Sequence, residues 1–119
     1  MLIESYQHTP LGKLNVARGP ANGPKLLLLH GMSNRWQTFL PILPELTKNW
    51  QVIAFDHRGH GGSDRIDGPY SAAAFFQDAR NVLDTIGPEP VALLGHSMGG
   101  SLALYLAEAF PEKVRAVIT

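Results

Sequence analysis

Cysteine is absent from the 119 residues, which excludes disulfide bridges and thiolate metal sites. Charge of either sign is not in excess, because ten Lys and Arg residues are balanced by ten Asp and Glu residues. This balance argues against nucleic acid or an anionic membrane as a partner. No apolar run approaches the roughly 20 residues of a membrane-spanning helix, and residues 1–6 lack the pattern of a signal peptide. We therefore expect a soluble cytoplasmic protein.

The length suits one domain and is too short for two. Partial alternation on either side of the turn signal Thr9-Pro10-Leu11-Gly12 predicts an N-terminal antiparallel hairpin. Short, continuous apolar runs are typical of parallel strands that are covered on both faces, and they occur at residues 25–29, 51–55, 90–94 and 114–118.

Between these runs, apolar residues recur at spacings of three and four. This spacing predicts helices over residues 36–48, 71–86 and 98–110, the first made irregular by Pro41 and Pro44. Strands that alternate with helices predict an α/β fold: a doubly wound, mostly parallel sheet, preceded here by the antiparallel hairpin. Ligands of such sheets bind at the carboxyl ends of the strands.

The segment Gly95-His96-Ser97-Met98-Gly99 falls where a predicted strand meets a predicted helix. It has the Gly-x-Ser-x-Gly pattern of a nucleophile elbow, a strained turn that exposes the serine hydroxyl. A Cβ atom two residues to either side of the serine would clash, which explains Gly95 and Gly99. The Met98 amide would face a developing oxyanion. The alternative is a glycine-bounded turn with a surface serine, and the strand–helix context favours the nucleophile.

A second motif, His30-Gly31-Met32, directly follows four consecutive leucines. Gly31 would let the backbone pass close to the nucleophile, and the Met32 amide would be the second oxyanion donor. We expect the His30 side chain to be a buried structural group that braces the turn, rather than the catalytic base. We expect His96, beside the serine, to point into the packing between strand and helix.

The third motif, residues 55–64, contains three glycines, two carboxylates and an arginine. It predicts a tight loop held by local ion pairs and hydrogen bonds beside the oxyanion turn. A metal site at His57 and His60 is the alternative, and it is disfavoured because no third ligand falls at a suitable spacing. We therefore expect neither a metal nor a cofactor.

In this order, the three motifs resemble those of the α/β-hydrolase superfamily, and the likeness covers the whole chain. The resemblance implies a serine hydrolase that cleaves an ester or related acyl bond of a small molecule through an acyl-enzyme. It assigns the nucleophile to Ser97 and the oxyanion hole to the Met32 and Met98 amides. Branches with an aspartate nucleophile are disfavoured because position 97 is serine.

In that family the catalytic acid and histidine follow later strands, and no residue of this chain matches either. We therefore expect residues 1–119 to be the N-terminal part of a single domain, without the lid or the C-terminal strands, and inactive or very weak alone. The uncovered edge strand at residues 114–118 would be covered by a missing C-terminal half or by a second chain, and the first is favoured. The alternatives are a ligand-binding or receptor module without catalysis and a truncated, non-functional fragment.

Overall fold

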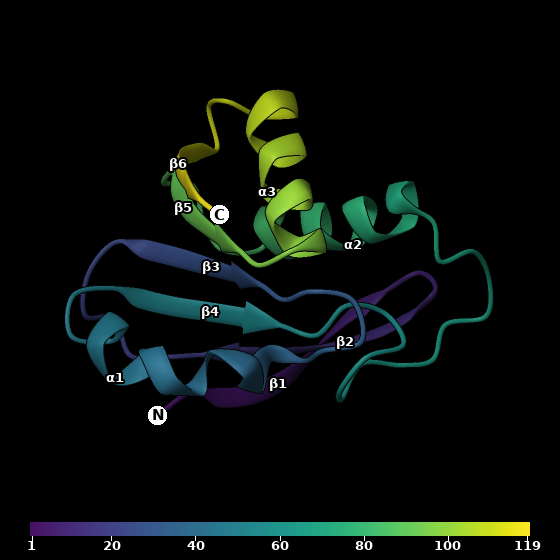
Figure 1. The fold of residues 1–119 in the computed structure, drawn as a ribbon, viewed down its shortest axis with the longest axis horizontal. Coiled ribbons are helices and arrows are strands. Elements are labelled where there is room, and N and C mark those ends of the chain that lie inside the picture. Colours follow the sequence, from purple (N-terminus) through teal and green to yellow (C-terminus); the bar gives the residue numbers. More distant parts are fainter.

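Six strands form one mixed sheet, in the order β1-β2-β4-β3-β5-β6, in the computed structural model, which describes residues 1–119 (Figure 1). β1 and β2 form the antiparallel hairpin, β2 also pairs antiparallel with β4, and the remaining pairs are parallel. This confirms the predicted mostly parallel sheet with its N-terminal hairpin. The strands are β1 (Ile3–Thr9), β2 (Gly12–Arg18), β3 (Lys25–Leu29), β4 (Gln51–Phe55), β5 (Val91–Gly95) and β6 (Val114–Ile118).

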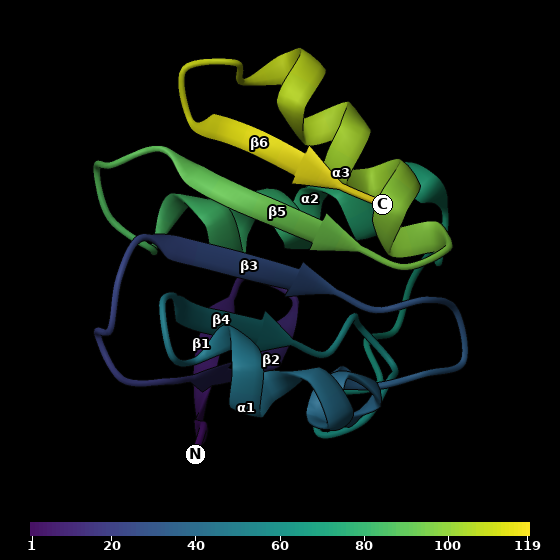
Figure 2. The ribbon, with the colours of Figure 1, turned by 60° about the vertical axis from the view of Figure 1, so that its left-hand side comes forward.

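The central strands are apolar throughout because helices cover both of their faces. Leu27 and Leu29 of β3 pack with residues of α2 (Ala72–Asp84) and α3 (Met98–Ala109). Their neighbours Leu26 and Leu28 point the other way, into a cluster with residues of the segment that precedes β4. Figure 2 shows this arrangement, with α1 (Leu43–Leu46) in front of the sheet and α2 and α3 behind it.

The segment before β4 is irregular, as its prolines predict. It forms a 3₁₀-helix, η1 (Trp36–Ile42), followed by a single turn of α-helix, α1 (Leu43–Leu46). Pro41 lies inside η1 and Pro44 lies in the first turn of α1, where a missing amide hydrogen costs little. By contrast α2 is regular, and the Ser71 hydroxyl caps it by accepting a hydrogen bond from the Ala74 amide at 3.2 Å.

The two ends of the sheet are exposed edges, β1 on one side and β6 on the other. Ile118 of β6 remains about half exposed, and β6 pairs only with β5. None of the helices has both the length and the apolar character that crossing a bilayer requires. The carboxyl ends of the parallel strands β3, β4 and β5 lie side by side at one end of these strands. The three sequence motifs that follow the strands therefore meet there.

Candidate active site

Ser97 occupies a strained backbone position between β5 and α3. Its φ is 56° and its ψ is −118°, a combination that L-residues avoid and that costs about 1–3 kcal/mol. Ser97 is the N-cap residue of α3, yet its side chain makes no capping hydrogen bond. The residue is exposed. The turn therefore holds a free hydroxyl at the surface, beside the N-terminus of a helix.

Gly95 and Gly99 bring the two arms of this turn into backbone contact. A Cβ atom on Gly95 would collide with the Gly99 carbonyl, and one on Gly99 would collide with the Leu29 carbonyl. The start of α3 thus lies directly against the end of β3. The sequence predicts glycine at both positions, and the reason is this backbone contact, which leaves no space for a Cβ atom.

The turn after β3 lies beside the serine. A Cβ atom on Gly31 would lie 3.2 Å from the Ser97 Cβ atom, so these two residues lie side by side. Met32 is exposed, and its amide makes no hydrogen bond. The Met98 amide is the first of α3 and has no partner within the helix. The structure therefore brings together Gly31, Met32, Ser97 and Met98.

His30 and His57 bind each other's backbone at the base of this turn. The His57 amide donates to the His30 ring at Nε2 (3.1 Å), and the His57 ring donates from Nε2 to the His30 carbonyl (2.9 Å). His30 also lies 2.7 Å from the Gly31 carbonyl through Nδ1. Both rings are fully buried. The interpretation of His30 as a structural group that braces the turn is confirmed.

The same burial disfavours the charged form of both histidines. It lowers the pKa of His30, and burial together with the neighbouring His30 lowers the pKa of His57 to about 3. Nδ1 of His57 is buried without a hydrogen-bond partner, so a proton there would find no acceptor. Neither ring is placed to act on Ser97.

Asp56 ties the loop after β4 to its surroundings. Its carboxylate accepts hydrogen bonds from the Trp36 amide (2.7 Å), the Gly62 amide (2.9 Å) and the Asn15 side chain (3.0 Å). All three donors belong to different parts of the chain. The predicted tight loop is confirmed in this respect, since hydrogen bonds hold it at several points.

The expectation of local ion pairing within that loop is wrong for Arg58. Its guanidinium crosses to α2 and forms a two-pronged pair with Asp78, from Nε to Oδ2 at 2.6 Å and from Nη2 to Oδ1 at 2.8 Å. Both side chains are buried, and the hydrogen bonds to Asp78 raise the pKa of Arg58. The sequence did hold one signal of this pair: Asp78 is a charged residue on the apolar stripe of its helix, three residues after Phe75.

The expectation that His96 points into the strand–helix packing is also wrong. His96 is exposed, and its Nδ1 would lie 3.3 Å from a Cβ atom on Gly31, so its ring lies beside the turn after β3. His60 is held through both ring nitrogens, by the Arg58 carbonyl and the Ser33 amide. No hydrogen bond reaches the Ser97 hydroxyl from any residue in the structure.

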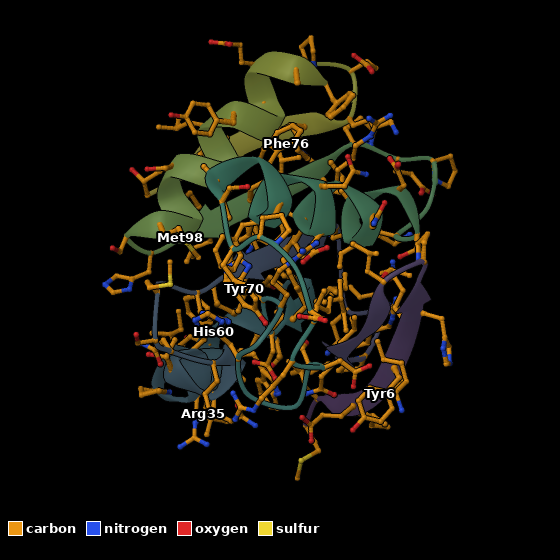
Figure 3. The ribbon with its side chains drawn as sticks, turned by 90° about the vertical axis from the view of Figure 1, so that its right-hand side faces the viewer. Tyr6, Arg35, His60, Tyr70, Phe76 and Met98 are labelled. Atoms are coloured by element: carbon orange, nitrogen blue, oxygen red, sulfur yellow. The ribbon has the colours of Figure 1, made fainter.

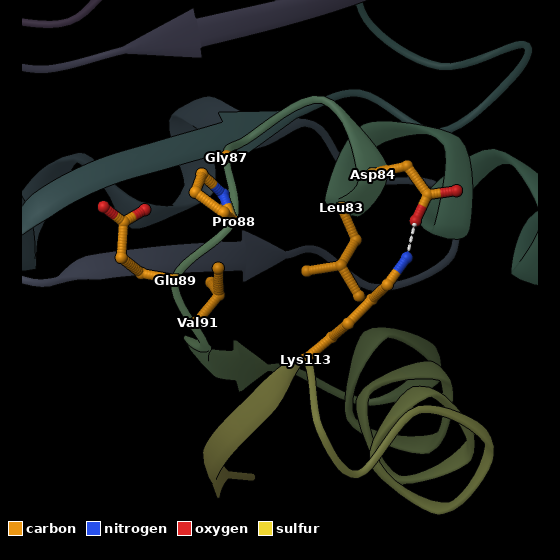
Figure 4. Close-up of a pocket in the computed structure, with 7 residues that line it drawn as sticks. All are labelled: Leu83, Asp84, Gly87, Pro88, Glu89, Val91 and Lys113. Carbon is orange, nitrogen blue, oxygen red and sulfur yellow. Dashed lines mark hydrogen bonds and ion pairs between the residues drawn. The ribbon is translucent and has the colours of Figure 1, made fainter.

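No group of three or more His, Asp or Glu side chains is placed to hold a metal ion. A hollow of about 310 Å³ lies at the opposite end of the parallel strands, near the start of β5. Lys113 pairs with Asp84 there (Figure 4). It is remote from Ser97, which follows the other end of β5. Its lining residues are Leu83, Asp84, Gly87, Pro88, Glu89, Val91 and Lys113.

Comparison with known proteins gives one consistent result. A family model described as alpha/beta hydrolase fold matches residues 24–119. A serine hydrolase-like protein of Danio rerio is 36% identical over 102 residues, which are 84% of this chain and 31% of the relative. A 2-(acetamidomethylene)succinate hydrolase of Mesorhizobium japonicum is 33% identical over 105 residues, which are 88% of this chain and 37% of that protein.

Among solved structures, the thioesterase domain from the curacin biosynthetic pathway superposes with a TM-score of 0.92 at 26% identity. The match covers 98% of this chain and 45% of that domain. The chain thus spans about a third of the length of the curated relatives named above and less than half of this structure.

Proposed function

The chain belongs to the α/β-hydrolase family, and from this membership we propose that it carries the nucleophile of a serine hydrolase that cleaves an ester or related acyl bond. The observation that carries the proposal is the backbone of Ser97, which is strained at φ 56° and leaves the hydroxyl exposed and free. A strained residue of this kind persists only where the surrounding structure enforces it, and such residues cluster at active sites.

In the proposed reaction, the Ser97 hydroxyl oxygen attacks the carbonyl carbon of the substrate while a histidine takes the hydroxyl proton. The Met32 and Met98 amides donate hydrogen bonds to the resulting oxyanion. The leaving group departs with the proton from the histidine. Water, deprotonated by the same histidine, then attacks the acyl-enzyme and releases the acid and free Ser97.

The proposal assigns the histidine and its acid partner to residues outside 1–119, in a C-terminal continuation or in a second chain. The histidines of the described chain support this assignment. His30, His57 and His60 are held by backbone groups, and His8 lies on the edge strand β1. His96 is exposed beside Ser97 but makes no hydrogen bond to its hydroxyl. The same outside segment would pair with β6, whose edge is open.

The test uses the full-length gene product and a fluorophosphonate probe that labels activated serines. We expect a single adduct on Ser97 by peptide mass spectrometry, and a loss of ester turnover of about 10³-fold or more in Ser97→Ala. Ser101→Ala is the matched control, because Ser101 is an exposed serine in the first turn of α3. Full turnover in Ser97→Ala would overturn the proposal.

The second candidate is a binding module that keeps the fold without catalysis. It is favoured by one observation, the absence of any hydrogen bond between the Ser97 hydroxyl and a histidine of this chain. It predicts that the full-length protein binds small acyl compounds while the probe leaves Ser97 unlabelled. Labelling of Ser97 therefore separates the two candidates.

A further inference from the structure

A polar cavity of about 550 Å³ lies between the turn that follows β3 and the loop that follows β4. It has no hydrophobic residue in its lining and no carboxylate, which distinguishes it from the hollow with the Lys113–Asp84 pair. It holds two guanidinium groups. Its lining residues are Ser33, Asn34, Arg35, Gly59, His60, Gly61 and Arg65.

The two guanidinium groups have no anionic partner in the structure. Arg35 forms no ion pair, and its side chain makes no hydrogen bond. Arg65 makes a single 3.3 Å hydrogen bond, to the Gly59 carbonyl, and no ion pair. Arg58, in the same loop, is by contrast neutralised by Asp78. The cavity therefore presents two positive charges whose planar donors remain open to an anion.

The wall between these arginines is fixed rather than loose. The Ser33 amide donates to Nε2 of His60 at 3.0 Å, and Nδ1 of His60 donates to the Arg58 carbonyl at 2.8 Å. Ser33 itself has a φ of 65°, a left-handed conformation that a serine adopts only when its neighbours enforce it. The Asn34 amide closes the turn onto the Gly31 carbonyl at 3.2 Å. Hydrogen bonds thus hold the backbone beside Arg35, while the side chains of Arg35 and Arg65 are exposed to solvent.

This turn also forms part of the candidate active site. Gly31 contacts Ser97, and Met32, the candidate oxyanion donor, is followed directly by Ser33 of the cavity wall. Figure 3, which looks onto this side of the molecule, shows Met98, His60 and Arg35 one below another. The cavity thus begins at the residue that follows Met32 and lies on the same side of the molecule as Met98.

We propose that the cavity is a subsite for a carboxylate on the acyl part of the substrate, with Arg35 and Arg65 as specificity-determining residues. Guanidinium groups bind carboxylates through paired, charge-assisted hydrogen bonds, and two of them beside one polar cavity favour an acyl chain that ends in a negative charge. The inference rests on the proposed function of Ser97, and it narrows the substrate class to esters whose acyl part carries a carboxylate.

The test compares two esters of similar length in the full-length gene product, 4-nitrophenyl hemisuccinate and the uncharged 4-nitrophenyl butyrate. We expect Arg35→Gln and Arg65→Gln each to raise KM for the hemisuccinate about tenfold, and the double variant to raise it further. In each variant, kcat/KM for the butyrate should stay within about twofold. Arg18→Gln, on β2, is the control and should change neither ester. If the arginine variants change the kinetic constants for both esters by the same factor, the proposed subsite is wrong.

A second measurement keeps the subsite separate from the role of Ser97. Calorimetric titration of Ser97→Ala with succinate should show binding, and adding Arg35→Gln and Arg65→Gln should remove it. If Ser97→Ala keeps full turnover, the nucleophile assignment fails while this titration still decides the subsite. If succinate binds equally with and without the two arginines, the subsite is wrong and the role of Ser97 stands.

Discussion

Lowering the pH from 8 to 5 is expected to reduce the free energy of unfolding through His57. The His57 ring is fully buried and donates from Nε2 to the His30 carbonyl, while its Nδ1 has no partner. Burial, reinforced by the neighbouring His30, lowers the pKa of His57 from 6.5 to about 3. The folded protein therefore resists protonation at a position where the unfolded chain accepts a proton readily.

The direction follows from which state binds the proton. Well above pH 6.5 His57 is unprotonated in both the folded and the unfolded state, and its contribution to stability is fully present. As the pH falls from 6.5 towards 3, the unfolded chain gains a proton that the folded protein does not, so stability is lost. At pH 5 the loss is about 2 kcal/mol, because pH 5 lies about 1.5 units below the unfolded pKa and each unit is worth about 1.36 kcal/mol. His30, whose pKa is also lowered, adds to the loss in the same direction.

The assay is urea unfolding at pH 8 and pH 5, followed by tryptophan fluorescence. His57→Gln removes the titrating ring, and the loss between the two pH values should shrink by about 2 kcal/mol, even though this variant is less stable at both. His8→Gln changes an exposed histidine on β1. Its free energy of unfolding should fall between pH 8 and pH 5 by as much as that of the parent protein. If the free energy of unfolding falls equally between pH 8 and pH 5 in the parent and in His57→Gln, His57 is not the group responsible.

Three further predictions concern stability, each measured by urea unfolding. Gly99→Ala should destabilise the protein by about 3 kcal/mol, because the new Cβ atom would collide with backbone. In the control Gly100→Ala, the nearest contact of the new Cβ atom would be 3.3 Å, and the free energy of unfolding should stay within about 1 kcal/mol of the parent's. Equal effects of the two substitutions would contradict this prediction. Arg58→Met should cost about 3–5 kcal/mol by leaving Asp78 buried and unpaired, and combining it with Asp78→Leu should recover most of that loss. Ser97→Gly should be about 1 kcal/mol more stable than Ser97→Ala, because only glycine tolerates that backbone without strain, and the reverse order would refute the strain.

The fold was predictable because its signals are local. The run of leucines in β3 and its counterpart in β4 identify strands buried on both faces, and the strand bounds agree with the structure. The two prolines before β4 predict an irregular helix, but they do not determine that it is a 3₁₀-helix. A choice between 3₁₀ and α geometry depends on small energy differences that packing decides.

The parts of the site that escaped prediction depend on contacts between distant segments. The pairing of Arg58 with Asp78 joins residues 20 apart in the chain, and the sequence marks only that Asp78 lies on an apolar stripe. The exposure of His96, beside the turn after β3, depends on how two distant turns meet, which no local pattern shows. The cavity with Arg35 and Arg65 likewise arises only when two loops meet. The roles of Ser97 and of its neighbouring amides remain predictions.

The backbone contact between β3, β5 and the start of α3 also bears on how the site can change over evolutionary time. Because Gly95 and Gly99 interpose no side-chain atoms, the start of α3 rests on strand backbone and not on core side chains. Its position is inherited from the spacing of hydrogen-bonded strands, which is nearly invariant. Loops around it, such as the one that carries Arg65, can diverge in length and charge without moving the Ser97 backbone. If Ser97 is the nucleophile, substrate preference can change by mutation in these loops while the position of the hydroxyl is kept.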